Sequence, residues 1–425
     1  MRRKTLVQGG LALAVAGLVI AFALMWRPAI APLPQAIAGH DAESIRRGAR
    51  VVEQGDCAVC HTRPGGAYMA GGLPLVTPFG TLYTTNITPD PASGIGLWPE
   101  EAFIRAMRNG IARDGHLLYP AFPYVHYSRM SERDIRDAYA FLMSVDPVQA
   151  HAPPNQMMFP MNFRPLVAFW NLLFLHGAPL QDVAGQSTQW NRGRYLVEGA
   201  GHCSSCHSPL NFIGGEKGSE LFNGGVVDGW DAPSLRGLSE GPHPWNTEQL
   251  QAYLRGQVAE GHGAAAGPML PVSLSLAQLP SADVQAIADY ILSLKPDADK
   301  SRAAPCALAQ PAVAVASEGA TLFAGACAGC HGPAAPMRMV DGRPGLEQSS
   351  ALRADSPRNL IKTVLDGIPL SRGDASHYMP AFANSLNDSQ IAAIAGYLRE
   401  QTCSARPWAD LDKTISSLRQ EGHAK

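Results

Sequence analysis

The sequence predicts a mainly α-helical protein of three tandem domains that follow an N-terminal hydrophobic segment. The motif C-x-x-C-H occurs three times in the 425-residue chain, at intervals that suit domains of ordinary size. A short helix-forming segment precedes each copy, and a segment with apolar residues at three- and four-residue steps closes each unit. The three copies are Cys57–His61, Cys203–His207 and Cys327–His331.

This motif is typical of covalent haem attachment. Its two thiols form thioether bonds to haem vinyl groups, and the adjacent imidazole becomes the proximal ligand of the iron. A zinc site usually needs two C-x-x-C pairs close together, and a thioredoxin-like motif needs a surrounding βαβ pattern; the sequence has neither. We therefore expect three haem c groups in three class I cytochrome c domains. The expected attachment residues are Cys57, Cys60, His61, Cys203, Cys206, His207, Cys327, Cys330 and His331.

Each domain should begin with a helix before the motif and end with a helix that packs across it. We expect the first helices at 41–55, 189–201 and 317–325, and the closing helices at 131–142, 281–292 and 387–398. Ser131, Ser281 and Asn387 are the candidate N-caps, and Asn387 with Gln390 fits a capping box. The predicted divisions are 1–31, a signal peptide or membrane anchor; 41–150, cytochrome c domain 1; 151–186, an apolar connector; 187–296, cytochrome c domain 2; 297–316, a linker; 317–403, cytochrome c domain 3; and 404–425, a C-terminal tail.

The N-terminus carries an export signal. Three basic residues follow Met1, and an apolar run extends from Gly9 to Trp26. The tripeptide Ala29–Ala31 offers a cleavage site, whereas the length of the run approaches that of a retained membrane anchor. Under either interpretation the remainder is exported, so we expect it on the periplasmic side of the inner membrane, where haem c is attached.

Net charge and cysteine content bear on two further questions, which are nucleic-acid binding and disulfide formation. The net charge is −2 and no basic stripe is visible, so the sequence gives no indication of nucleic-acid binding. Six of the eight cysteines belong to the motifs, which leaves Cys306 and Cys403 at either end of the third domain. An oxidising compartment favours a disulfide between them, and two unpaired thiols are the alternative.

Methionine is the usual sixth ligand of a haem that transfers electrons at high potential. Met379 and Met269 lie in the loops before the third and second closing helices, and we expect them to be these ligands. In the first domain Phe122 stands where the others have Met. Met130 is the favoured ligand there, His126 is the alternative, and an open site is the third interpretation.

The connection after the first domain, Pro153 to Leu180, is strongly apolar. Its stretch from 157 to 175 carries a single charged residue, Arg164, yet it is too short and too interrupted by proline to span a bilayer. A segment of this kind is buried between domains, against another subunit or at a membrane surface.

The chain also resembles the three-haem cytochrome c subunits of bacterial membrane-bound dehydrogenases. The resemblance covers nearly everything after the N-terminal segment. Its most specific parts, besides the haem motifs, are Thr77–Gly80, Asn86–Asp90 and Tyr119–Tyr124. It implies an electron-transfer subunit with no substrate chemistry of its own. Its partners would be a catalytic dehydrogenase subunit, with or without a small iron–sulfur subunit, membrane quinone or a terminal oxidase, and the membrane surface.

Three further segments resemble the cytochromes that accompany molybdenum hydroxylases: Gly214–Gly218, Gly229–Pro233 and Gly263–Met269. We therefore favour a molybdenum hydroxylase as the partner. The cytochrome subunit of a quinoprotein or flavoprotein alcohol or polyol dehydrogenase is the alternative. Catalysis at a haem, as in a peroxidase or a reductase, is the rival from another class, and it requires an open sixth position.

Overall fold

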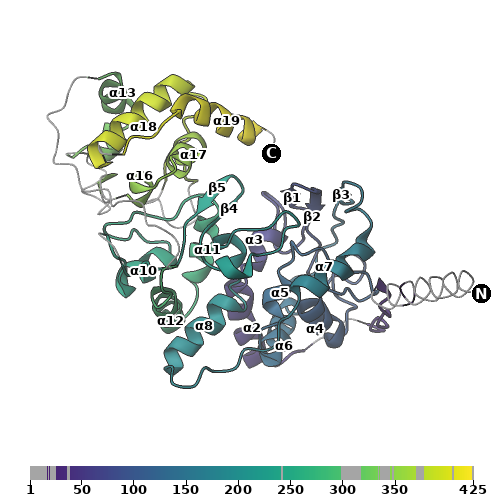
Figure 1. Cartoon of the computed structure of the whole chain (residues 1–425). Coiled ribbons are helices and arrows are strands. Elements are labelled where there is room, and N and C mark those ends of the chain that lie inside the picture. Colours follow the sequence, from purple (N-terminus) through teal and green to yellow (C-terminus); the bar gives the residue numbers. More distant parts are fainter. Residues whose placement is uncertain are drawn as a thin grey trace, which may run out of the picture. The chain divides into compact units, whose positions relative to one another are not determined.

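The computed structural model describes residues 17, 19, 25–35, 39–240, 243–297, 317–333, 335, 345–346, 349–369, 378–403 and 406–423. These residues are predominantly helical, which confirms the predicted mainly α class (Figure 1). The chain forms two compact units. The first comprises Met1–Ala184 and Glu198–His202, and the second comprises Gly185–Val197 and Cys203–Lys425. The predicted domain limits remain predictions.

The first unit contains the first C-x-x-C-H motif, which forms the short helix α3. An antiparallel sheet of three short strands in the order β1-β2-β3 lies in the same unit. Its elements are α2 (Ala42–Gln54), α3 (Cys57–His61), β1 (Pro74–Thr77), β2 (Gly80–Tyr83), α4 (Glu100–Asn109), α5 (Tyr124–Tyr127), α6 (Glu132–Leu142), β3 (Gln156–Met157), the 3-10 helix η1 (Arg164–Leu166) and α7 (Val167–Phe174).

The second unit contains the other two motifs, in α9 and α14, and a two-stranded antiparallel sheet of β4 and β5. The first helix of the second predicted domain, α8 (Thr188–Glu198), has all but its last residue here. The other elements are α9 (Ser204–His207), the 3-10 helix η2 (Gly218–Glu220), β4 (Gly225–Val227), β5 (Trp230–Ala232), α10 (Thr247–Leu254), α11 (Met269–Leu276), α12 (Ser281–Leu292), α13 (Glu318–Ala326), α14 (Ala328–His331), α16 (Ser350–Arg353), α17 (Arg358–Asp366), α18 (Asp388–Cys403) and α19 (Leu411–His423).

The same helix crossing occurs three times. The helix before each motif packs on the closing helix through a glycine: α2 on α6 at Gly48, α8 on α12 at Gly193, and α13 on α18 at Gly319. A Cβ at any of these positions would lie less than 3.0 Å from a backbone carbonyl oxygen of the partner helix, so glycine permits the close approach. The contacted carbonyls belong to Asp137, Ala286 and Ala393.

An aromatic residue lies one turn further along each closing helix. The Cβ atoms of Phe141, Tyr290 and Tyr397 are the next neighbours of the same three glycines. An aromatic side chain of the closing helix therefore adjoins the crossing glycine in all three copies. The same packing of two helices is therefore an internal structural repeat with three copies.

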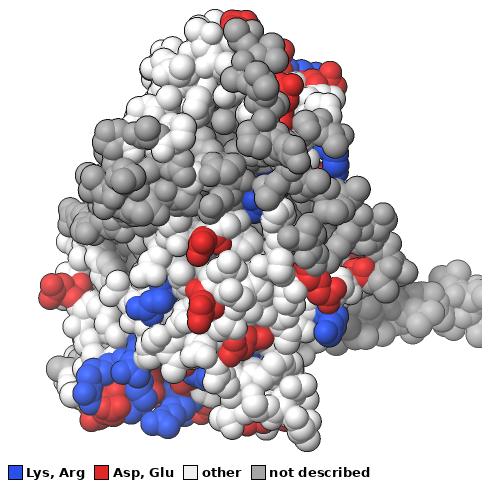
Figure 2. All heavy atoms as spheres, turned by 90° about the vertical axis from the view of Figure 1, so that its left-hand side faces the viewer, with Lys and Arg blue, Asp and Glu red and all other residues white. Residues whose placement is uncertain are grey.

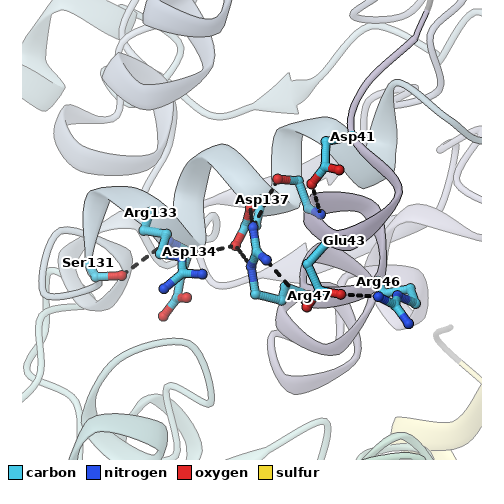
Figure 3. Close-up of polar contacts among 9 residues, drawn as sticks. Asp41, Glu43, Arg46, Arg47, Ser131, Arg133, Asp134 and Asp137 are labelled. Carbon is cyan, nitrogen blue, oxygen red and sulfur yellow. Dashed lines mark hydrogen bonds and ion pairs between the residues drawn. The ribbon is translucent and has the colours of Figure 1, made fainter.

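The crossing in the first unit has an additional ion pair. The Arg47 guanidinium donates to both carboxylate oxygens of Asp137, with Nε–Oδ2 at 2.6 Å and Nη2–Oδ1 at 2.9 Å (Figure 3). Only 5% of the Asp137 side chain is exposed. In the second unit Arg192 pairs instead with Asp283, near the start of α12, and the Arg192 side chain is 44% exposed.

Two of the three predicted N-caps are correct. Ser131 Oγ accepts the backbone N–H of Asp134 at 3.1 Å, and Asn387 forms a reciprocal capping box with Gln390 at 2.9 and 3.0 Å. The prediction for Ser281 was wrong. Ser281 is the first helical residue of α12, because Pro280 before it supplies the extended entry and leaves no side-chain cap.

Several predictions concern residues at the edge of the described structure. Cys403 is buried at the end of α18 and is disulfide-bonded, whereas Cys306 lies outside the described residues. Most of the apolar run from Gly9 to Trp26, and the linker residues 298–316, also lie outside them. Within the part of the chain that the structure describes, no helix is long and apolar enough to cross a membrane.

One face of the molecule carries few charged side chains. Figure 2 shows that Lys and Arg gather near its lower end, where Asp and Glu are interspersed with them. Most of the remaining described surface in that view is uncharged. This face therefore presents no extended field of a single sign among its described residues.

Candidate haem attachment sites

The first motif histidine is held by a backbone carbonyl. His61 Nδ1 lies 2.6 Å from the carbonyl oxygen of Thr85. A carbonyl oxygen can only accept, so Nδ1 carries the proton and the lone pair resides on Nε2. This is the tautomer that a proximal ligand requires, and the second contact of the ring sets its orientation.

A β-hairpin places that carbonyl. The N–H of Gly71, just before β1, donates to the carbonyl oxygen of His61 at 2.7 Å, and Thr85 follows β2. Gly71 has φ +72°, and a Cβ there would lie less than 3.0 Å from the backbone of Thr85. The two ends of the hairpin therefore enclose the histidine. The N–H of Gly71 contacts its backbone carbonyl oxygen, and the carbonyl oxygen of Thr85 contacts its ring.

The segment Asn86–Asp90 holds the end of this hairpin in place. The Asn86 amide donates to the carbonyl oxygen of Val148 at 2.7 Å. Asp90 Oδ1 accepts from the backbone N–H and the hydroxyl of Ser93 at 2.6 and 2.7 Å, and these bonds lower the pKa of Asp90. The family-like segment thus has a structural task, which is to fix the carbonyl that His61 contacts.

The second motif repeats this arrangement with different residues. His207 Nδ1 lies 2.7 Å from the carbonyl oxygen of Pro233, which follows β5. The N–H of Gly224, just before β4, donates to the carbonyl oxygen of His207 at 2.8 Å, and Gly224 has φ +88°. A β-hairpin again encloses the motif histidine, so the two sites share one plan.

Neither hairpin is among the elements predicted from the sequence, although the second has a recognisable sequence signal. Asp228 and Gly229 connect β4 to β5, and both have positive φ, at +50° and +76°. An Asp-Gly pair between short β-forming runs is a strong hairpin signal. The first hairpin turns at Pro78 and Phe79, within the segment Thr77–Gly80 that contributes to the family resemblance.

Burial determines the protonation of the motif side chains. It lowers the pKa of both His61 and His207, while the hydrogen bonds to the carbonyl oxygens act in the opposite direction. Burial also raises the pKa of Cys57 and of Cys203 to about 12. The imidazoles are therefore neutral and able to ligate iron, and these two thiols are poorly suited to thiolate chemistry.

The third motif spans Cys327 and α14, and burial raises the pKa of Cys327 as well. Residues 336–344, which follow this motif, lie outside the described residues, and so do Met337 and Met339. A contact that corresponds to Thr85 or Pro233 is therefore described only for the first two motifs.

The predicted sixth ligands of the second and third domains lie in ordered segments. Met269 is the first residue of α11 and packs against the core of its domain. Met379 pairs with Ile368 through two main-chain hydrogen bonds of 2.9 and 3.0 Å. Both assignments remain predictions, and the ordered backbone at each position suits a residue that must hold its side chain in place.

The first domain has no methionine at the corresponding place. Phe122 is partly buried there, and its ring centroid lies 5.4 Å from that of Tyr127. The favoured ligand, Met130, and the alternative, His126, are each only 1% exposed. Met130 belongs to the main apolar cluster of the unit, which Cys57 also contacts. The role of Met130 as the sixth ligand remains a prediction.

Comparison with known proteins identifies the family. The cytochrome c family matches residues 191–295, and the family of subunit III of cbb3-type cytochrome c oxidase matches residues 314–398. The chain is 33% identical to the fructose dehydrogenase cytochrome subunit of Gluconobacter japonicus, with 89% of this chain and 83% of the relative covered. It belongs to the family of dehydrogenase cytochrome c subunits. It is thus an electron-transfer subunit with covalently bound haem c.

Other members of the family show its range. The chain is 35% identical to the gluconate 2-dehydrogenase cytochrome c subunit of Pantoea cypripedii, with 89% of this chain and 90% of the relative covered. It is 47% identical to a nicotinate dehydrogenase subunit of Pseudomonas putida over 94% of its own length. That alignment spans only 34% of the relative, so this cytochrome corresponds to about a third of that longer protein.

Proposed function

We propose that this subunit carries three haem c groups and relays electrons from the catalytic subunit of a dehydrogenase to membrane quinone or the respiratory chain. The observation that carries the proposal is the repeated enclosure of a neutral motif histidine by a β-hairpin, at His61 and at His207. When bound, a haem iron supplies a one-electron redox couple. The chain would attach it through the two thiols, orient the proximal imidazole and supply methionine as the sixth ligand.

The proposed attachment residues are Cys57, Cys60, His61, Cys203, Cys206, His207, Cys327, Cys330 and His331, with Met130, Met269 and Met379 as the sixth ligands. A pyridine haemochrome assay on the purified protein tests their number, and three haems per chain is the expected value. Mass spectrometry of haem peptides locates them. Two haems per chain, or a motif peptide without haem, would contradict the proposal.

The proposed partner is a molybdenum hydroxylase. Support comes from the three segments noted above and from the higher identity to the nicotinate dehydrogenase subunit than to the sugar and gluconate dehydrogenase subunits. Co-purification from native membranes with metal analysis tests this assignment. Molybdenum in a complex with a large hydroxylase subunit supports it. A flavoprotein or quinoprotein partner would replace it with alcohol, sugar or polyol oxidation.

We further propose that the first unit rests on the membrane surface through its apolar connector. Seven apolar side chains from one stretch are exposed, and Phe159 is 86% exposed. We call this set the connector surface. Its members are Met158, Phe159, Met161, Phe163, Phe169, Leu172 and Leu173.

The only charged side chain of residues 157–175 is directed to the protein rather than to this surface. Arg164 donates to the carbonyl oxygen of Leu117 at 3.2 Å, and its guanidinium lies 4.6 Å from the ring centroid of Tyr119. Val167 and Ala168 fasten α7 to the unit by packing with Ile111. Phe169, Leu172 and Leu173 lie on α7, and the other four members lie in the segment before it. An uncharged apolar surface of this kind suits the lipid headgroup boundary, which favours the periplasmic face of the inner membrane as the location.

Labelling of native membranes with a photoactivatable apolar probe tests this placement. The peptide that contains the connector surface should be labelled, and the double substitution Phe159→Ser with Leu173→Ser should reduce the labelling. Phe212→Ser is the matched control, because Phe212 is 89% exposed in the second unit. Equal labelling of both peptides would contradict the proposal. Protection that depends on the catalytic subunit would identify a subunit interface instead.

A further inference from the structure

The hairpin that encloses His207 also contacts a helix of the third predicted domain. The side-chain amide of Asn359, on α17, donates to the carbonyl oxygen of Asp231 at 2.8 Å and accepts the N–H of Asp231 at 2.9 Å. This pair of bonds satisfies both main-chain groups of one residue of β5. Asn359 thus takes the place of a further strand on the edge of the hairpin.

Two neighbours of Asn359 extend the contact. Arg358 donates to the carbonyl oxygen of Gly229 at 3.0 Å, and its guanidinium lies 3.7 Å from the carboxylate of Asp231. The ammonium of Lys362, one turn along α17, lies 5.4 Å from the ring centroid of Trp230. One helix therefore meets the hairpin turn and β5 through hydrogen bonds, charge and an aromatic ring.

The contacted strand reaches both sides of the second proposed haem site. Pro233, the residue after β5, accepts the ring N–H of His207. A Cβ at Gly267 would lie less than 3.0 Å from the indole of Trp230, and Gly267 is two residues before Met269. The hairpin thus adjoins the proximal histidine and the loop of the proposed distal methionine.

The same helix leads directly to the third proposed site. Gly367 ends α17, and the next residue, Ile368, forms the two main-chain bonds that hold Met379. A Cβ at Gly367 would overlap the backbone of Met379 and Pro380. A displacement of α17 would therefore move the backbone of the proposed ligand Met379.

We infer that α17 is a positioning element for electron transfer between the second and third haems, with Asn359 as its central contact. The helix touches the strand that orients His207 and continues into the segment that holds Met379. It holds the two proposed haem sites at a fixed distance and orientation through contacts with the main chain, without ligating either iron. The inference rests on the proposed assignment of these two haem sites.

The test compares Asn359→Leu with Thr363→Ala in the full-length holoprotein. Leu removes both bonds to Asp231 at similar volume. Among the described residues, the hydrogen bond of the Thr363 hydroxyl goes to the carbonyl oxygen of Asn359 within the same helix, so its loss should leave the contact with Asp231 intact. Amide hydrogen exchange of the peptide that contains Asp231 should accelerate by about tenfold or more in Asn359→Leu, since two net hydrogen bonds are lost.

The second readout is the rate of electron equilibration between the second and third haems after flash reduction. It should fall in Asn359→Leu by the factor by which the docked population falls, and should be unchanged in Thr363→Ala. Unaltered exchange, or faster exchange with an unaltered rate, would overturn the inference. A wild-type protein without haem on the Cys203–His207 or Cys327–His331 peptides would instead overturn the proposed function.

Discussion

The first and second motif histidines are held in the same way, whereas the distal sides of their sites differ. Each imidazole donates to a carbonyl oxygen that follows a hairpin, 24 residues after His61 and 26 residues after His207. The residues that provide these carbonyls, Thr85 and Pro233, have unrelated side chains. Because the contact uses only the main chain, it does not itself require a particular side chain at that position.

The distal side depends on side-chain chemistry, so its variation is visible in the sequence. The second domain offers Met269 and the third offers Met379, but the first has Phe122 in the corresponding place. A proximal contact made by the backbone does not depend on the side chain of the residue that makes it, whereas a change of the distal residue would alter the proposed ligand and the potential. On the proposed ligand assignment, the comparison predicts that the first haem differs in potential from the other two because of its distal residue.

The largest expected effect is a loss of stability when the glycine before a hairpin is replaced, and this loss should differ between the two hairpins. Gly71→Ala should destabilise the first unit by about 3 kcal/mol or more, because strain at positive φ adds to overlap with the backbone of Thr85. Gly224→Ala should cost about 1–2 kcal/mol, since its nearest neighbours are no closer than 3.0 Å. Thermal unfolding of the holoproteins followed by circular dichroism measures both.

Gly65→Ala is the control for this comparison. Gly65 has φ +69°, and a Cβ at this position would meet no described atom within 4 Å, so its substitution reports backbone strain alone. Equal losses for Gly71→Ala and Gly65→Ala would show that the approach of Thr85 does not limit the first site.

The next effect concerns the helix crossings. Asp137→Ala should destabilise the first unit by about 3 kcal/mol, because Arg47 loses a buried bidentate partner (Figure 3). Asp283→Ala should cost about 1 kcal/mol or less, since 44% of the Arg192 side chain is exposed and water screens the pair. Urea unfolding of the two variants at low and high salt compares them. A loss for Asp283→Ala as large as that for Asp137→Ala would refute the assigned difference in burial.

Sequence reasoning succeeded where periodicity and side-chain chemistry carry the information. The closing helices α6 and α12 begin within a residue of their predicted starts, because apolar spacing and capping residues mark them. It failed at the hairpins, where the decisive groups are the carbonyls of Thr85 and Pro233 and the N–H groups of Gly71 and Gly224. Such groups are present at nearly every residue, and only tertiary structure selects among them.

A smaller effect depends on pH and concerns His262 in the second unit. Burial, with a further contribution from Arg353, lowers the pKa of His262 to about 4, and the ring stacks on Trp245 at 3.6 Å. The unfolded chain takes up a proton below about pH 6.5, whereas the folded chain does so only near pH 4. The stability that neutral His262 contributes is therefore fully present above pH 6.5 and is lost as the pH falls from 6.5 towards 4.

Melting temperatures of the wild type and of His262→Gln across this pH interval measure the contribution. The difference between them should narrow at low pH, because the variant cannot lose the stability that His262 loses. His243 also lies near the ring, so His243→Gln is the control for a neighbouring charge. Parallel pH profiles for wild type and His262→Gln would rule out His262 as the titrating group.

The substitution with the smallest expected effect on stability tests which residue is the sixth ligand of the first haem. Met130→Leu should change the free energy of unfolding by less than about 1.5 kcal/mol, because the two side chains have similar volume. If Met130 ligates the first haem, the methionine-to-iron charge-transfer absorption should lose one of its three contributions. Met143→Leu is the control, because Met143 belongs to the same apolar cluster and should leave the spectrum intact. A spectrum unchanged by Met130→Leu but altered by His126→Phe would establish bis-histidine ligation. Such ligation would place the first haem at a lower potential than the other two.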